Sequence, residues 1–299
     1  TEPLGFESRG DAAFARREFQ NASRLWLRAL KNEPDNTALV VKLSEASVKL
    51  GRHERAKDYL KKAMTLDPDN PAHVVRLAKL HILDNELDAA GQLCDALAAK
   101  GVNHPEFFLV RADLNMLLDR PDMAETFYKK AVAVSPETLK ALLKLAVFYK
   151  SRGRDDQARE LVEMVTRKEI FSVPILLLLS DYYFYGDQND QAESYILKAI
   201  EQEPEDRGLR IQQLRFTLIT GQLEKAESIL NLLLSKQEDL YLRMMLADLY
   251  IMTGRMDAAE QIIDRLKPQI REPLIEFELL QGKYWLMAGK QIYATSHLR

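Results

Sequence analysis

An alanine that recurs every 34 residues constrains the fold of this chain more than any other feature. The alanines stand at Ala22, Ala56, Ala90, Ala124, Ala158, Ala192 and Ala226, and the series continues at Ala259 and Ala294. A larger residue, mostly apolar, follows each one by four positions, from Trp26 to Leu298, and another apolar residue follows three later. These spacings place all of them on one face of a helix. The sequence therefore predicts a tandem array of helical repeats.

Turn signals divide each repeat into two helices. Five residues before each alanine from Ala56 onward stands a residue that tolerates the left-handed backbone of a helix end: Gly51, Asn85, Asp119, Gly153, Asp187, Gly221, Gly254 and Gly289. Several repeats then close on a proline, at Pro34, Pro68, Pro136 and Pro204, and a proline cannot continue a helix. Each repeat is predicted to contain a first helix, a tight turn, a second helix and a proline-marked turn.

This pattern resembles the tetratricopeptide repeat family over essentially the whole chain. Residues 139–165 carry the family pattern well, with Leu145, Ala146, Tyr149, Gly153 and Ala158 in place. The resemblance implies an all-α fold, an α-solenoid in which antiparallel helix pairs wind into one right-handed superhelix over residues 1–299. We assign nine repeats, at 3–36, 37–70, 71–104, 105–138, 139–172, 173–206, 207–239, 240–274 and 275–299.

Two departures from the family pattern carry predictions of their own. Leu214 stands where the family has a small residue, which predicts altered helix packing in the seventh repeat. The ninth repeat stops within its second helix and no polar capping helix follows. Because a helix stack needs a cap over its last apolar face, we expect the natural protein to continue beyond residue 299.

The resemblance also implies a concave groove, lined by positions 2, 5, 9, 12 and 13 of each repeat. Position 5 is mostly apolar and position 9 mostly charged, with acidic residues in the majority. The candidate groove residues are Val75, Lys79, Leu109, Asp113, Met116, Leu143, Leu177, Asp181, Phe184, Tyr185, Ile211, Arg215, Met244, Asp248 and Met252. They predict a protein or peptide partner that is apolar or amphipathic and carries basic residues. Burial of position 5 between successive first helices is the alternative interpretation.

Composition argues against several other classes of function. The net charge of −3 does not favour nucleic acid as a partner, and no apolar run approaches the ~20 residues of a membrane-spanning helix. The single cysteine, Cys94, allows no internal disulfide, which fits a bacterial cytoplasm and a periplasm or envelope equally. We find no phosphate-binding loop, no metal-ligand spacing and no catalytic constellation, so we expect no cofactor, no metal and no enzymatic activity.

Three functions remain in competition. The leading hypothesis is a non-catalytic scaffold that binds a protein or peptide segment in the concave groove. A carboxylate clamp of the chaperone-binding type is not expected, because position 5 is apolar and position 9 is never asparagine. The second hypothesis is a structural component of a bacterial envelope or exopolysaccharide export complex, which exposed apolar residues on the second helices would favour. The third is a substrate-recruiting region of a larger enzyme. The oligomeric state is left open.

Overall fold

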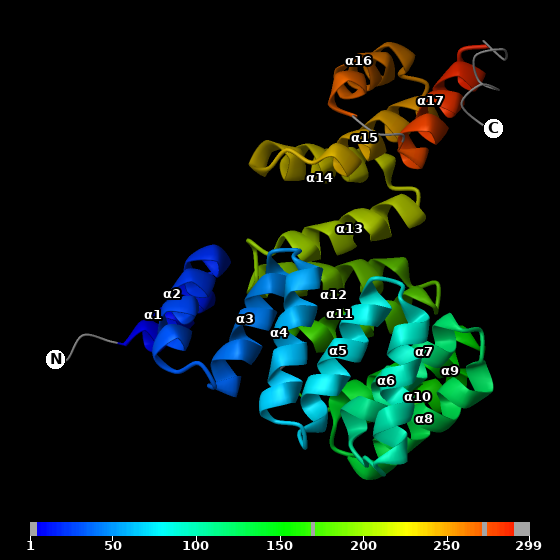
Figure 1. Ribbon diagram of the computed structural model, residues 1–299. Helices are drawn as coiled ribbons and strands as arrows, with labels where there is room; N and C mark the ends of the chain where they lie inside the picture. The colour runs from blue at the N-terminus through cyan, green and yellow to red at the C-terminus, as the bar shows by residue number, and fades with distance from the viewer. Residues whose placement is uncertain (1–4, 169–170, 271–273, 290–299) are drawn as a thin grey trace. The chain divides into compact units, whose positions relative to one another are not determined.

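The computed structural model describes residues 5–168, 171–270 and 274–289. Within these ranges the chain forms α-helices, one short 3₁₀ helix at Lys267–Gln269 and no strand (Figure 1). The helices are α1 (Phe6–Ala15), α2 (Phe19–Asn32), α3 (Thr37–Lys49), α4 (His53–Leu66), α5 (Pro71–Leu83), α6 (Leu87–Ala99), α7 (Pro105–Leu117), α8 (Pro121–Val134), α9 (Leu139–Ser151), α10 (Asp155–Thr166), α11 (Val173–Phe184), α12 (Asn189–Gln202), α13 (Arg207–Ile219), α14 (Leu223–Lys236), α15 (Leu240–Met252), α16 (Met256–Leu266) and α17 (Ile275–Met287).

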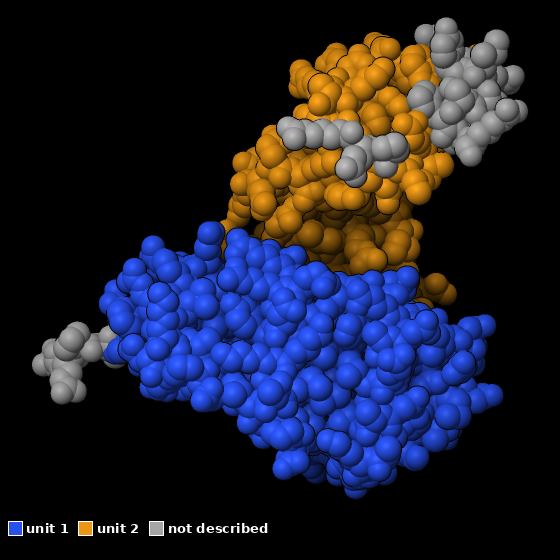
Figure 2. Space-filling model, viewed as in Figure 1, with its two compact units in different colours: residues 1–167 blue, residues 168–299 orange. Residues whose placement is uncertain are grey.

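Consecutive helices pack as antiparallel hairpins, α1 against α2 and so on to α15 against α16 (Figure 1). The fold is an all-α solenoid of helix pairs, which confirms the predicted fold class. Its backbone contacts group into two compact units, residues 1–167 with α1 to α10 and residues 168–299 with α11 to α17 (Figure 2). A single superhelix over the whole chain stays a prediction. None of the described helices is both long and apolar enough to cross a membrane.

The turn inside each hairpin contains one residue in the left-handed conformation. All eight predicted turn residues have a positive φ, between 53° and 74°. After each of the first seven of these turn residues, the next residue donates its backbone N–H to a carbonyl of the first helix. Arg154, for example, donates to the Tyr149 carbonyl at 2.9 Å, and a bond of this kind caps the helix end. The ninth such residue, Arg17 (φ 62°), was not predicted, because an arginine is not a turn signal.

The recurring alanine is buried in every described hairpin. The eight described alanines of the 34-residue series are fully buried, and the larger residues that follow four positions later are buried as well. A methyl group lets the helix backbones approach closely, and the larger side chain fills the adjacent space. The predicted packing face is thus confirmed for these eight repeats, whereas Ala294 and Leu298 lie outside the described residues.

The seventh repeat packs differently from the others. The equivalent position on the other first helices holds glycine, alanine or serine, but α13 carries Leu214, which is fully buried beside Ala226 and Leu230. The helices α13 and α14 make fewer close backbone approaches than the other hairpins. A larger side chain between two helices holds them further apart, so the predicted local change in packing is confirmed.

Candidate functional site

A large apolar side chain is exposed at the end of the first helix in six repeats. These are the position-13 residues Leu83 and Leu117 in residues 1–167, and Tyr185, Ile219, Met252 and Met287 in residues 168–299. Between 52% and 69% of each residue's surface is exposed. The same position holds Ala15, Lys49 and Ser151 in the other three repeats. Large apolar side chains repeated at one structural position are typical of a binding surface.

The helices α11 and α13 enclose a pocket of about 340 Å³ beside two of these residues. Its apolar wall comes from Leu177, Phe184 and Tyr185 on α11 and from Phe216 and Ile219 on α13. The rings of Phe184 and Phe216 meet edge to face with their centroids 6.0 Å apart. Its polar groups include Asp181 and Arg215. Five predicted groove residues therefore lie together here, namely Leu177, Asp181, Phe184, Tyr185 and Arg215.

A second pocket, of about 330 Å³, lies between the first helices α15 and α17. It contains two further predicted groove residues, Met244 and Asp248, together with Tyr241, Leu279 and Lys283. Each pocket is thus formed by the first helices of two successive repeats. Sequence reasoning omitted Ile219, Leu279 and Lys283 from the candidate set, although the repeat register would have found them.

Several predicted groove residues offer a ligand almost no surface. The position-5 residues Val75, Leu109, Leu143 and Met244 are buried, while Leu177 and Ile211 are half-buried. Val75, for example, packs in a cluster with Phe107 and Val110 of the next first helix. The burial of these four residues agrees with the alternative interpretation, although Met244 also lines the pocket between α15 and α17. Of the remaining apolar candidates, Met116 and Met252 are exposed at the ends of α7 and α15.

Three of the predicted groove charges, Lys79, Asp113 and Asp248, pair with an oppositely charged residue of the next first helix. Asp113 accepts an ion pair from Lys144 of the next first helix at 2.6 Å and a hydrogen bond from Tyr128 at 2.8 Å. Asp248 accepts an ion pair from Lys283 at 2.9 Å. The same cross-links join Asp11 to Lys42, Glu45 to Arg76 and Lys79 to Glu106. These pairs neutralise the acidic residues on which the expectation of a basic partner rested.

Glu106 forms ion pairs with two cations at once, Lys79 and Lys140. Burial alone would raise the pKa of this carboxyl, but the two ammonium groups outweigh it and lower the pKa from 4.5 to about 2. A carboxyl with a lowered folded-state pKa stabilises the fold above its unfolded pKa and loses that contribution as the pH falls toward the folded value. The relevant window here runs from about pH 4.5 down to about pH 2.

We expect Glu106→Gln to lower the free energy of unfolding at pH 7 by an amount on the order of 2 kcal/mol, allowing for solvent screening of a partly exposed group. The difference from wild type should shrink as the pH falls through that window, because protonation neutralises the wild-type carboxyl too. Urea unfolding at a series of pH values measures it. The control Glu160→Gln removes an exposed carboxylate of α10. A difference for Glu106→Gln that does not change with pH would contradict the ion-pair account.

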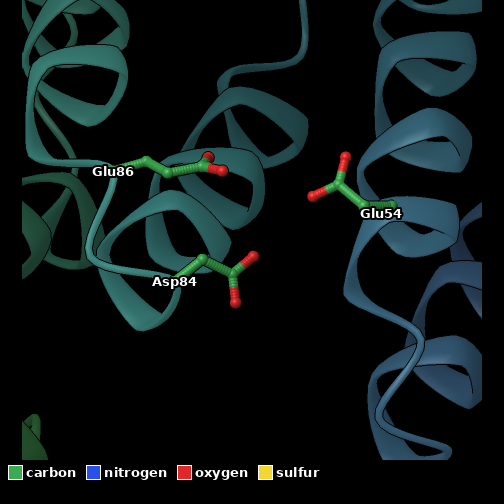
Figure 3. Close-up of side chains that lie close together, drawn as sticks. All are labelled: Glu54, Asp84 and Glu86. Carbon is green, nitrogen blue, oxygen red and sulfur yellow. The ribbon is translucent and has the colours of Figure 1, made fainter. Parts of the chain in front are cut away.

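Three carboxylates converge at the junction of α4, α5 and α6. Glu54 points from α4 toward Asp84 and Glu86, which lie in the turn between α5 and α6 (Figure 3). Three acidic groups within reach of one another are a potential metal site. The Lys57 ammonium is bonded to all three, at 2.8 Å from Glu54, 2.7 Å from Asp84 and 2.8 Å from Glu86. The cluster therefore already holds a cation of the protein's own.

Lys57 is buried, with 3% of its side chain exposed. Burial alone would lower the pKa of its ammonium, but the hydrogen bonds to the carboxylates outweigh it and raise the pKa. His53 lies 2.5 Å from Asp84, and His81 contacts Glu86. The residue pattern did not predict this network, because its members come from α4, from α5 and from the turn between α5 and α6. Its chemistry is that of a structural ion cluster.

Cys94 is buried, as predicted for its position in the repeat, in an apolar cluster that includes Ala90 and Leu97. Burial raises the pKa of the thiol to about 11. The thiol is therefore protonated at neutral pH, and a buried protonated thiol is a poor nucleophile. This arrangement agrees with a packing role for Cys94.

Comparisons with known proteins agree with the repeat pattern. Sequence models described as tetratricopeptide repeat match residues 8–71, 48–114 and 173–206. A solved tetratricopeptide repeat protein from Thermus thermophilus is 21% identical, with 61% of this chain and 99% of that chain covered and a TM-score of 0.52. Another solved tetratricopeptide repeat protein, from Parabacteroides merdae, is 21% identical, and the match covers 87% of this chain and 90% of that chain with a TM-score of 0.44. No curated protein matches the sequence.

Proposed function

Because this chain is a tetratricopeptide repeat protein, and such repeats generally serve as protein-interaction scaffolds, we propose that it holds an apolar segment of another protein in the pocket between α11 and α13. On this proposal the chain is non-catalytic, and the partner contacts it along the position-13 residues Tyr185 and Ile219. The observation that carries the proposal is that these two exposed side chains flank an open pocket with an aromatic wall.

The dimensions of the pocket support a protein segment as its ligand. A volume of about 340 Å³ is at the low end of the range for ligand sites, so it accommodates one or two large side chains. Binding energy at protein interfaces is concentrated in a few aromatic and apolar anchors inserted into such pockets. Phe184 and Phe216 provide the aromatic wall, and Tyr185 and Ile219 lose exposed apolar surface when the site is covered.

Two observations favour this function over the alternatives. The described histidines all lie in residues 1–167, so the described part of residues 168–299 provides no histidine to act as a base beside Ser180 in the pocket. In the described parts of the chain, a second helix exposes at most two large apolar residues, and these are Met123, Val134, Met164, Leu197 and Leu232. Scattered residues of this kind are normal on a protein surface and do not indicate an assembly face.

The test is selection of a random peptide library on the immobilised full chain, followed by affinity measurement on the selected peptides by fluorescence polarisation. We expect apolar or amphipathic peptides that bind with micromolar dissociation constants. Ile219→Glu and Tyr185→Glu should each weaken that binding by about tenfold or more, because they place a charge where the apolar anchor is buried.

Leu197→Glu is the matched control, since it adds the same charge at an exposed apolar residue of α12, outside the pocket. It should leave the affinity unchanged. All three positions are at least 40% exposed, so the variants are expected to fold, and circular dichroism checks this. The proposal fails if no peptide binds, or if Leu197→Glu weakens binding as much as Ile219→Glu does.

A further inference from the structure

Arg215 differs from the predicted groove charges Lys79, Asp113 and Asp248 because it has no partner among the described residues. It forms no hydrogen bond, ion pair or ring contact with any residue in the described parts of the chain, and it is exposed at the pocket between α11 and α13. By contrast, Lys79, the other basic candidate, binds Glu106 of the following first helix. An unpaired guanidinium beside an apolar pocket is available to a ligand.

The repeat register explains why Arg215 is unpaired. Glu106, the partner of Lys79, stands at position 2 of the next repeat. In the repeat that follows Arg215, position 2 is Tyr241, which has no carboxylate. On α13 itself, Gln212 occupies the position of the basic residues Lys42, Arg76 and Lys144, so it adds no charge to the pocket. Asp181 also lines the pocket, but it is already engaged in an interaction within the protein. Among the described charged residues that line the pocket, the one without a partner is therefore the cation Arg215.

We infer that the partner segment carries an aspartate or glutamate next to its apolar anchor, and that Arg215 binds this carboxylate while the anchor occupies the pocket. The inference rests on the function proposed above and defines the class of partner. A guanidinium binds a carboxylate through two parallel hydrogen bonds, and the apolar side chains of Phe184 and Ile219 line the same pocket as Arg215. The partner is thus acidic, whereas the acidic groove residues had suggested a basic one.

The experiment uses peptides selected on the wild-type full chain. We expect an acidic residue to be enriched beside the apolar anchor. Replacing that residue by its amide should weaken binding by about tenfold, and so should Arg215→Glu. A peptide in which lysine replaces the acid should regain affinity on the Arg215→Glu variant, because the exchange restores opposite charges. Amidation of the peptide's C-terminus should have no effect.

Arg265→Glu is the matched control: it changes the net charge equally at an exposed arginine of α16 that lines neither pocket. It should leave the dissociation constant unchanged. Suppose the selected peptides bind and lose affinity with Ile219→Glu. Suppose also that Arg215→Glu does not change their affinity, that they carry basic residues, or that they require only a free C-terminus. The inference is then wrong while the proposed function stands. If no peptide binds at all, both are wrong.

Discussion

Replacing Lys57 by methionine should lower the free energy of unfolding of residues 1–167 by about 3 kcal/mol, which is the lower part of the range for breaking a buried ion pair. Methionine keeps much of the apolar stem but removes the charge that Glu54, Asp84 and Glu86 share. Asp84 is the most buried of the three carboxylates, so its unpaired charge contributes most of the loss. Burial alone would raise the pKa of Asp84, but in the wild type Lys57 and His53 outweigh it and lower the pKa.

The two tryptophans allow this measurement in one compact unit. Trp26 lies in residues 1–167 and Trp285 in residues 168–299, so a Trp285→Phe background leaves Trp26 as the only reporter. Urea unfolding followed by tryptophan fluorescence gives the free-energy difference. Lys61→Met, an exposed lysine on the same helix, is the control and should cost less than about 0.5 kcal/mol. Equal effects of the two substitutions would show that the carboxylates do not depend on Lys57.

Leu214→Ala should destabilise residues 168–299 by about 2–5 kcal/mol, the range observed when a buried leucine leaves a cavity. Leu214, a residue of α13, is fully buried in a cluster with Ala226 and Leu230 of α14. The other first helices carry a small residue at this position and approach their partners more closely. In α13 the helix spacing has adjusted to leucine, so alanine leaves a gap there even though alanine suits the equivalent position elsewhere.

Trp285 reports on this substitution, because it packs against the apolar cluster that contains Leu214. The measurement is urea unfolding in a Trp26→Phe background, with Leu232→Ala as the control. Leu232 is 40% exposed on α14, so its truncation should cost less than about 1 kcal/mol. An effect of Leu214→Ala no larger than the control's would mean that α13 and α14 close over the missing side chain.

The sequence predicted the fold closely because the signals that define a hairpin are local. A buried alanine such as Ala158 and a left-handed residue such as Gly153 lie within one repeat, and their spacing alone identifies both helices and the turn. Arg17 was missed because the backbone there is left-handed despite its side chain. In that case the packing of α1 on α2, not the residue's own preference, sets the conformation.

The candidate site was only partly predictable, because burial of a first-helix residue depends on the helix beside it. Val75 and Leu177 share position 5, yet Val75 is buried and Leu177 lines a pocket. Likewise the charge at Asp113 looked available until its partner, Lys144, was located 31 residues further along the chain. The family pattern specifies which way a residue faces, whereas the neighbouring repeat determines what covers or neutralises it.

The ion pairs between first helices have a consequence for how this chain could change by duplication or loss. Hairpins of equal length look interchangeable. The pairing of Lys79 with Glu106, however, matches the third repeat to the fourth, and the pairing of Lys144 with Asp113 matches the fifth repeat to the fourth. Loss of residues 105–138 would remove both acids and bring Lys79 against Lys140 and Lys144. Like charges at these positions repel, so the order of the repeats is itself encoded in the sequence.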